Sequence, residues 1–103
     1  MDIDKMRDCP VLATIAVMGG KWKPRILWHL RDGAARFGEL RRVTGVSEKV
    51  LHENLRALER DGLVSRAPVR IGDVVYVEYR YTEYGLSLVP VLDAMGQWGL
   101  AHR

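Results

Sequence analysis

The chain has 103 residues, of which 48% are hydrophobic and 28% charged, a globular balance that excludes an intrinsically disordered chain. This length predicts one domain, residues 1–103, that buries roughly two-thirds of its unfolded surface. The net charge of +3 is uneven, because residues 21–80 hold 13 of the 16 Lys and Arg but 8 of the 13 Asp and Glu. This basic middle favours a surface that faces a polyanion, although scattered solubilising charge would give the same totals.

The first residues carry neither the basic region nor the apolar region of a signal peptide. The longest apolar run, "VLATIAVMGG", has about half of the ~20 residues that a membrane span needs. A single cysteine excludes an intramolecular disulfide framework. The sequence therefore predicts a cytoplasmic protein with no membrane partner.

Four helices are expected first in chain order. Pro10 suits the first position of the first helix, and Gly19 and Gly20 end it. Ser47 is the expected N-cap of the fourth helix, with Gly62 just past its end. The helices are expected at about 10–18, 24–32, 37–44 and 47–60.

The apolar pattern then changes from helical to alternating. The segments "LVSRAPV" and "VVYVEYRY" are rich in β-formers, and "IGD" between them predicts a turn with its tip near Gly72. Thr82 is expected to cap one last helix that runs through about His102, and Pro90 is expected to bend it.

Two short helices joined by "TGVS" and followed directly by a hairpin are typical of a winged helix-turn-helix. In such folds the second helix of the pair lies in the DNA major groove. The expected fold class is α+β, mainly α, with N- and C-terminal dimerisation helices. The helix-turn-helix is expected at about 37–60, the wing at about 64–81, and the dimerisation elements at about 10–18 and 83–102.

The fourth helix carries apolar residues on one side and charged residues on the other. Lys49, His52 and Arg56 form one exposed stripe suited to base edges and phosphates, and Glu53 beside them could accept from a cytosine amino group. Arginines of the third helix and of the hairpin suit phosphate or minor-groove contacts. The predicted DNA-binding residues are Ser47, Lys49, His52, Glu53, Arg56, Arg41, Arg42, Arg66, Arg70 and Arg80.

Seven segments occur in order along residues 9–99: "CPV", "GGKW", "RFGELRR", "GVSEKVL", "LRALERDGLVSR", "VEYRYTEYG" and "LVPVLDAMGQWG". In these segments the chain resembles HxlR-type transcriptional regulators, a winged-helix family related to the MarR type. The resemblance implies a cytoplasmic homodimer that binds double-stranded pseudo-palindromic operators. It also implies, for some members, a response to oxidants or electrophiles through the cysteine before the first helix. Two departures are the missing Pro-Pro ahead of "VEY" and His52, where many members have Thr.

Cys9 is the candidate redox-sensing residue. It precedes Pro10 at or near the N-cap of the first helix, where the helix dipole favours a thiolate. Generic cysteines are inert and buried, so a structural role stays open. With no second cysteine, a sensor would use sulfenic acid, a mixed disulfide, alkylation or a Cys9–Cys9 bridge across a dimer. The effector, an oxidant or another small molecule, is not identified by the sequence.

Apolar residues cover more than one face of the last helix, which one helix in a small domain cannot bury alone. We therefore expect it to pack, together with the first helix, against a second copy of the chain. Asp93 is expected at that interface or in solvent. The predicted interface residues are Leu12, Ile15, Ala16, Leu88, Val91, Leu92, Met95 and Trp98.

Catalytic and metal chemistry find no support in the sequence, which has no phosphate loop, nucleophile elbow or close carboxylate pair. The three histidines are dispersed, and Cys9 has no companion ligand at metal-site spacing. Neither an enzyme nor a cofactor is expected. The competing function is a winged-helix protein–protein interaction module without sequence-specific DNA binding. Such a module should expose apolar residues on its fourth helix, whereas this helix exposes Lys, His, Glu and Arg.

Overall fold

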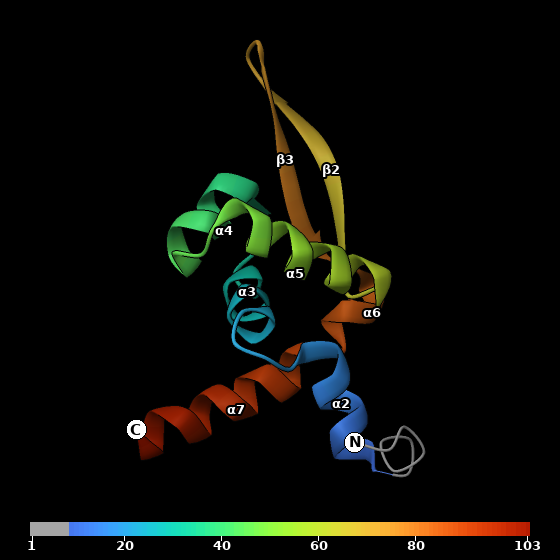
Figure 1. The fold of residues 1–103 in the computed structure, drawn as a ribbon, viewed down its shortest axis with the longest axis vertical. Helices are drawn as coiled ribbons and strands as arrows, with labels where there is room; N and C mark the ends of the chain where they lie inside the picture. The colour runs from blue at the N-terminus through green and yellow to red at the C-terminus, as the bar shows by residue number, and fades with distance from the viewer. Residues whose placement is uncertain (1–8) are drawn as a thin grey trace.

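The computed structural model describes residues 9–103 (Figure 1), so the part of the predicted domain at residues 1–8 lies outside it. The helices are α2 (Pro10–Met18), α3 (Lys23–Leu30), α4 (Phe37–Thr44), α5 (Glu48–Arg60), α6 (Glu83–Leu86) and α7 (Val89–His102). The strands are β1 (Ala35–Arg36), β2 (Val64–Ile71) and β3 (Val74–Tyr81). The predicted helix-turn-helix and hairpin are both present.

Local contacts fix the turn between α4 and α5. Gly45 ends α4 at a φ of 70°, a left-handed conformation that glycine adopts without strain. The predicted N-cap is confirmed, because the Ser47 hydroxyl accepts a hydrogen bond from the Val50 N–H at 3.3 Å. The buried Thr44 hydroxyl donates to the Leu40 carbonyl at 2.7 Å. Together these contacts set the direction in which α5 leaves the turn.

The three strands form an antiparallel sheet in the order β1-β3-β2. Strands β2 and β3 make the wing, which closes at Gly72 and rises away from the helices (Figure 1). Strand β1 was not predicted, since two residues are too few to show an alternating pattern. It pairs Arg36 with Glu78 and so joins the root of the wing to the residue directly before α4. Strand β2 is left at the outer edge of the sheet.

The prediction of one bent helix from Thr82 to about His102 is wrong. Thr82 does act as an N-cap, with its hydroxyl accepting from the Gly85 N–H at 2.9 Å, but the helix that it caps ends at Leu86. Pro90 lies in the first turn of α7. Proline fits there because the first N–H groups of a helix have no partner within it. Pro90 thus begins a second helix and does not bend a single one.

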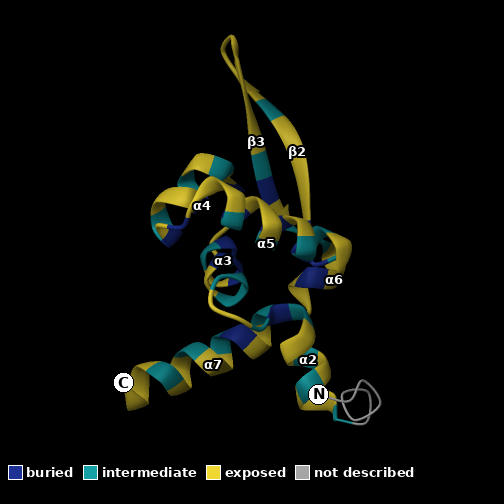
Figure 2. Cartoon of the chain, in the orientation of Figure 1, coloured by how far each residue is buried: buried dark blue, intermediate teal, exposed yellow. Residues whose placement is uncertain are grey.

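The core lies where α3, α5 and the root of the sheet meet, whereas the outer wing is exposed (Figure 2). Leu51, Leu55 and Leu58 of α5 are each at most 1% exposed, and they pack with the fully buried Ile26 and Leu27 of α3. The side of α5 that faces away from this core is thereby held toward solvent. Within residues 9–103, no helix combines the length and the apolar character that crossing a bilayer requires.

Candidate nucleic-acid interface

The outer side of α5 is the charged face that the sequence predicts. Lys49, His52, Glu53 and Arg56 are all exposed. In the part of the chain that the structure describes, neither Lys49 nor Arg56 forms an ion pair. Two cations about two turns apart on one face of α5 are therefore available to an external anion.

The ring of His52 is fixed by a contact that the sequence did not reveal. It stacks on Phe37, the first residue of α4, with 4.4 Å between ring centroids and 23° between planes. Phe37 is itself partly buried against the core. The stack joins the two helices of the motif on their exposed side and limits the directions in which His52 can point.

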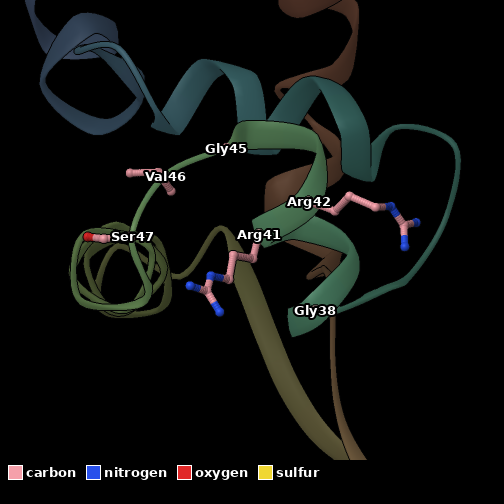
Figure 3. A pocket seen from close by; sticks show the side chains of 6 residues that line it. All are labelled: Gly38, Arg41, Arg42, Gly45, Val46 and Ser47. Carbon is pink, nitrogen blue, oxygen red and sulfur yellow. The ribbon is translucent and has the colours of Figure 1, made fainter.

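Arg41 and Arg42 border a shallow hollow of about 400 Å³ at the turn, together with Gly38, Gly45, Val46 and Ser47 (Figure 3). Their side chains leave α4 in different directions (Figure 3). Arg41 Nη1 lies 3.0 Å from Glu48 Oε1, and both side chains are more than half exposed. Such an exposed pair stabilises by at most about 1 kcal/mol, so a phosphate could replace the carboxylate.

The wing brings two of its three predicted arginines together. Register places Arg66 opposite Tyr79 and Arg70 opposite Val75, whereas Arg80 lies opposite Ser65. Since neighbouring residues of a strand point to opposite faces, Arg66 and Arg70 share one face and Arg80 lies on the other.

The face with Arg66 and Arg70 is the one beside α5, because Arg66 Nε lies 3.2 Å from Glu59 Oε1. Arg80 instead pairs with Glu78 on the far face. The structure therefore does not place Arg80 with the other predicted DNA-binding arginines of the wing.

Two tyrosines of β3 hold the root of the wing on the helices. The Tyr81 hydroxyl donates to the Leu27 carbonyl of α3, and burial raises the pKa of Tyr81 to about 12. Tyr79 is 2% exposed, and burial again, followed by the Glu59 carboxylate, raises the pKa of Tyr79. Both phenols stay neutral at physiological pH, so neither places a charge in the packing between the wing root and the helices.

The opposite end of the molecule carries an apolar surface on α2 and α7. A groove of about 480 Å³ runs between these helices, lined chiefly by Val11, Ile15, Met18, Val91 and Met95. Trp98 beyond it is 67% exposed.

Leu88 and Leu92, which were predicted at a dimer interface, instead belong to the core of this chain at 9% and 3% exposure. The helix break before α7 turns both of them inward. The other predicted interface residues (Leu12, Ile15, Ala16, Val91, Met95 and Trp98) are exposed or half-buried.

Asp93 is engaged within the chain rather than at an interface or in solvent alone. Arg31 Nη1 of α3 lies 3.0 Å from Asp93 Oδ1, and the Arg31 guanidinium stacks over Trp28 at 3.5 Å. The Trp28 ring also covers Gly96 so closely that a Cβ there would lie 2.3 Å from it. Gly96 therefore permits the close approach of α3 and α7.

Cys9 is confirmed as the N-cap residue of α2. It is half-buried, and its side chain makes no capping hydrogen bond.

A helix-turn-helix whose second helix exposes Lys49 and Arg56, a hairpin wing beside it and apolar helices at the far end define the winged helix-turn-helix class. A family model described as HxlR-like helix-turn-helix matches residues 17–103. The HTH-type transcriptional regulator YdeP of Bacillus subtilis (strain 168) is 41% identical over 101 residues, which cover 97% of this chain and 78% of YdeP.

Solved structures agree with this class. The redox regulator HypR superposes in its oxidized form with a TM-score of 0.84 at 41% identity, covering 92% of this chain and 98% of HypR. The reduced form of HypR superposes with a TM-score of 0.84 at 40% identity, covering 92% of this chain and 94% of HypR. A MarR-family transcriptional regulator of Porphyromonas gingivalis W83 superposes with a TM-score of 0.82 at 30% identity, covering 93% of this chain and 94% of that regulator.

The chain belongs to the HxlR-like helix-turn-helix family, which confirms the resemblance seen in the sequence. It is a transcriptional regulator of the helix-turn-helix type, and the family consists of regulators, not enzymes.

Proposed function

We propose that the protein binds double-stranded DNA sequence-specifically, as a homodimer on a pseudo-palindromic operator. The observation that carries this proposal is the outer face of α5, where Lys49 and Arg56 are exposed and have no carboxylate partner among residues 9–103. In a winged helix-turn-helix this face enters the major groove. Arg70 on the neighbouring face of the wing then lies toward the adjacent phosphates or minor groove.

The residues divide into two roles in this proposal. Lys49 and Arg56 supply affinity, and His52, with Ser47 at the helix start, modulates the base sequence that is read. Arg41, Arg42 and Arg66 contact phosphates, and Arg41 and Arg66 must exchange their intrachain carboxylates to do so. Glu53 accepts from a cytosine amino group or repels other bases.

A second copy of the chain is the partner that fits the apolar end. Val11, Ile15, Met95 and Trp98 are each at least 52% exposed, and monomers rarely leave so large an apolar surface uncovered. The surface lies at the far end of the molecule from the wing (Figure 1). Pairing through α2 and α7 would therefore leave both α5 helices free for DNA.

The test begins with DNA fragments selected from a random pool by the purified protein. We expect an inverted repeat, and we expect the double variant Lys49→Ala with Arg56→Ala to lose affinity for it. A base-reading Arg56 should contribute about 1–3 kcal/mol on the operator and less on random DNA. If the double variant binds both DNAs as the wild type does, α5 is not the reading element. The protein-interaction module would then be the better function.

A response to oxidants through Cys9 is a second proposed function. It is supported by the position of Cys9 at the N-cap of α2 and by the likeness to HypR, a redox regulator solved in oxidized and reduced forms. Diamide or peroxide should change operator affinity of the wild type, while a Cys9→Ser protein should keep its affinity. An equal response of both proteins, or none in either, would assign Cys9 a structural role.

A further inference from the structure

A second hollow, of about 340 Å³, lies at the root of the wing, and sequence reasoning assigned nothing to it. Arg36, Gly38, Glu39, Arg42 and Tyr76 line it. It shares Gly38 and Arg42 with the hollow at the helix-turn-helix turn. The two hollows are therefore neighbours on α4, and together they reach from the start of α5 to the wing.

Arg36 is held in place from two directions. Its backbone pairs with Glu78 in the sheet, directly before α4 begins. Its guanidinium lies 4.6 Å from the ring centroid of Tyr76 on the same face of the wing. A guanidinium stacked on an aromatic face keeps the donors along its edge free for a planar, two-pronged contact. Arg36 is thus an oriented cation, unlike a flexible surface lysine.

Two carboxylates near Arg36 and Arg42, those of Glu78 and Glu39, are engaged with other partners. Glu78, which lies opposite Arg36 in the sheet, pairs with Arg80. Glu39 lines the hollow itself, and its carboxylate is hydrogen-bonded to His29 Nε2. Across residues 9–103 no carboxylate lies within ion-pair distance of Arg36 or Arg42. The hollow therefore holds two unpaired cations against one carboxylate.

We propose that Arg36, Arg42 and the Tyr76 hydroxyl bind one backbone phosphate of the DNA that flanks the base pairs read by α5. The proposal rests on the proposed DNA-binding function and adds Arg36 and Tyr76 to it. A phosphodiester presents two non-bridging oxygens that share one negative charge, and they match the paired N–H donors of a guanidinium. Phosphate contacts of this kind fix the position of a reading helix without specifying sequence. Tyr76 is a positioning residue for Arg36 and also a hydroxyl donor.

The ligand is a phosphate within a nucleic acid and not a free ion, because the hollow is open and borders the reading motif. Arg36, Gly38 and Arg42 are exposed. An open site of this kind gives a free phosphate few contacts. A phosphate of a DNA strand is instead held there by the neighbouring contacts of α5 and the wing.

The experiment measures binding of the full chain to a fluorescein-labelled mixed-sequence duplex by anisotropy, over a series of KCl concentrations. Arg36→Ala should weaken binding by roughly tenfold or more at low salt. It should also lower the slope of log Kd against log salt by about 0.9, the value for one phosphate contact. Arg36→Lys should keep the slope and lose part of the affinity. Tyr76→Leu should weaken binding with little change in slope, because it removes the stacking ring and no charge.

Arg103→Ala is the matched control, since it removes one exposed cation at the end of the chain far from the wing (Figure 1), and its slope should equal that of the wild type. Thermal melting of each variant shows whether the wing root remains folded. An unchanged slope for a folded Arg36→Ala protein would overturn the inference.

Lys49→Ala with Arg56→Ala, measured in parallel, separates the two proposals. If the double variant loses affinity and Arg36→Ala does not, the phosphate site at the wing root fails while the reading face on α5 stands. If neither loses affinity, both the reading face on α5 and the phosphate site fail, and a wild-type protein that does not bind the duplex would reject DNA binding itself. Inorganic phosphate at constant ionic strength should not displace the duplex. Displacement that Arg36→Ala abolishes would assign the hollow to a free anion and reject the proposal.

Discussion

At the scale of single residues, we expect His52 to separate base reading from simple attraction to the DNA backbone. Its ring is exposed yet stacked on Phe37, so it presents a defined edge to the groove. We expect His52→Ala to change base preference within each half-site and to leave the salt slope nearly unchanged, since a contact with a base edge replaces no phosphate counterion. Selection from a random DNA pool with both proteins measures the preference. Identical selected sequences would remove His52 from the reading set.

Arg70 should show the opposite behaviour. It is an exposed wing residue on the α5 side, and we expect it to contact only phosphate or the minor groove. Arg70→Ala should weaken operator and random DNA by similar factors and lower the salt slope by about one unit. Arg103→Ala is its control, because Arg103 is an exposed cation at the end of the chain far from the wing (Figure 1). Equal losses in the two variants would show that wing charge acts only at long range.

Tyr81 makes the stability of the fold depend on pH in the alkaline range. Burial raises its pKa to about 12 from the ordinary value of 10.0, so the unfolded chain releases the phenolic proton at lower pH than the folded chain. The resulting stability is complete below pH 10 and is lost as pH rises to about 12. Thermal melting from pH 9 to pH 12 should show a falling midpoint that is less steep in Tyr81→Phe. Because the pKa of Tyr79 is also raised, part of the fall in the melting midpoint should remain in the Tyr81→Phe protein. Equal slopes would exclude this role for Tyr81.

Contacts between residues close together in the sequence could be predicted at this scale, whereas contacts between residues far apart in the sequence could not. The Ser47 cap and the Leu51, Leu55 and Leu58 face follow from spacing alone. The Arg36–Tyr76 stack does not, because it depends on the pairing of β1 with β3. Glu39 lies three residues before Arg42 and so within helical reach of it, yet Glu39 contacts His29 and Arg41 contacts Glu48. Several carboxylates lie within helical reach, so only packing decides among them.

At the scale of elements, α2 and α7 carry the proposed contact between two copies. Met95 and Trp98 are 52% and 67% exposed, so charging them should disrupt association without disturbing the core. We expect Met95→Asp with Trp98→Asp to convert the dimer to a monomer at micromolar concentration, as measured by light scattering. Val75→Asp, a charge placed on the 56% exposed wing residue, should leave the mass unchanged.

Leu92→Asp is unsuitable for this purpose, because Leu92 is 3% exposed and its replacement would unfold the chain. A wild-type protein that scatters as a monomer would reject the interface outright.

The helix break before α7 explains why the sequence predicted too wide an interface. The segment from Glu83 to His102 has apolar residues on every side, and a single helix would have exposed Leu88 and Leu92 with the rest. Because Ser87 and Leu88 separate α6 from α7, both leucines turn into the core. A proline was visible in the sequence, but whether it bends a helix or begins one depends on where the preceding helix stops.

At the scale of the whole molecule, the proposed dimer fixes the spacing of its binding site. A two-fold dimer should place its α5 helices in successive major grooves, roughly 34 Å apart along the duplex. Inserting about half a helical turn of DNA between the half-sites should rotate one half-site away and reduce affinity to that of a single half-site. Insertion of a full turn should restore little of the affinity. The Arg31–Asp93 pair and the Trp28–Gly96 contact hold α3 and α7 together, so the distance between the two α5 helices of a dimer should stay fixed. Anisotropy titrations on the unaltered operator and on the two operators with insertions measure these affinities. Equal affinities would indicate that the copies bind independently.

The order of elements was the most predictable property at this scale. Helix caps, the change of apolar period and the glycine turns give the helix-turn-helix and the wing without any structure. What the sequence lacked was the relative placement of distant elements, which decides whether a charged side chain is free or paired. The sorting of Arg66, Arg70 and Arg80 between two faces needed the strand register.

The position of β2 at the edge of the sheet has a consequence for the protein in the absence of DNA. An exposed edge strand offers unpaired N–H and C=O groups to the same strand of another molecule, and such pairing leads to aggregation. Pro68, midway along β2 opposite Val77, has no N–H to donate and interrupts that edge. Pro68→Val should leave the hairpin intact and speed the growth of light scattering in concentrated solution. Pro68 would thus prevent wing-to-wing pairing in protein that is not bound to DNA.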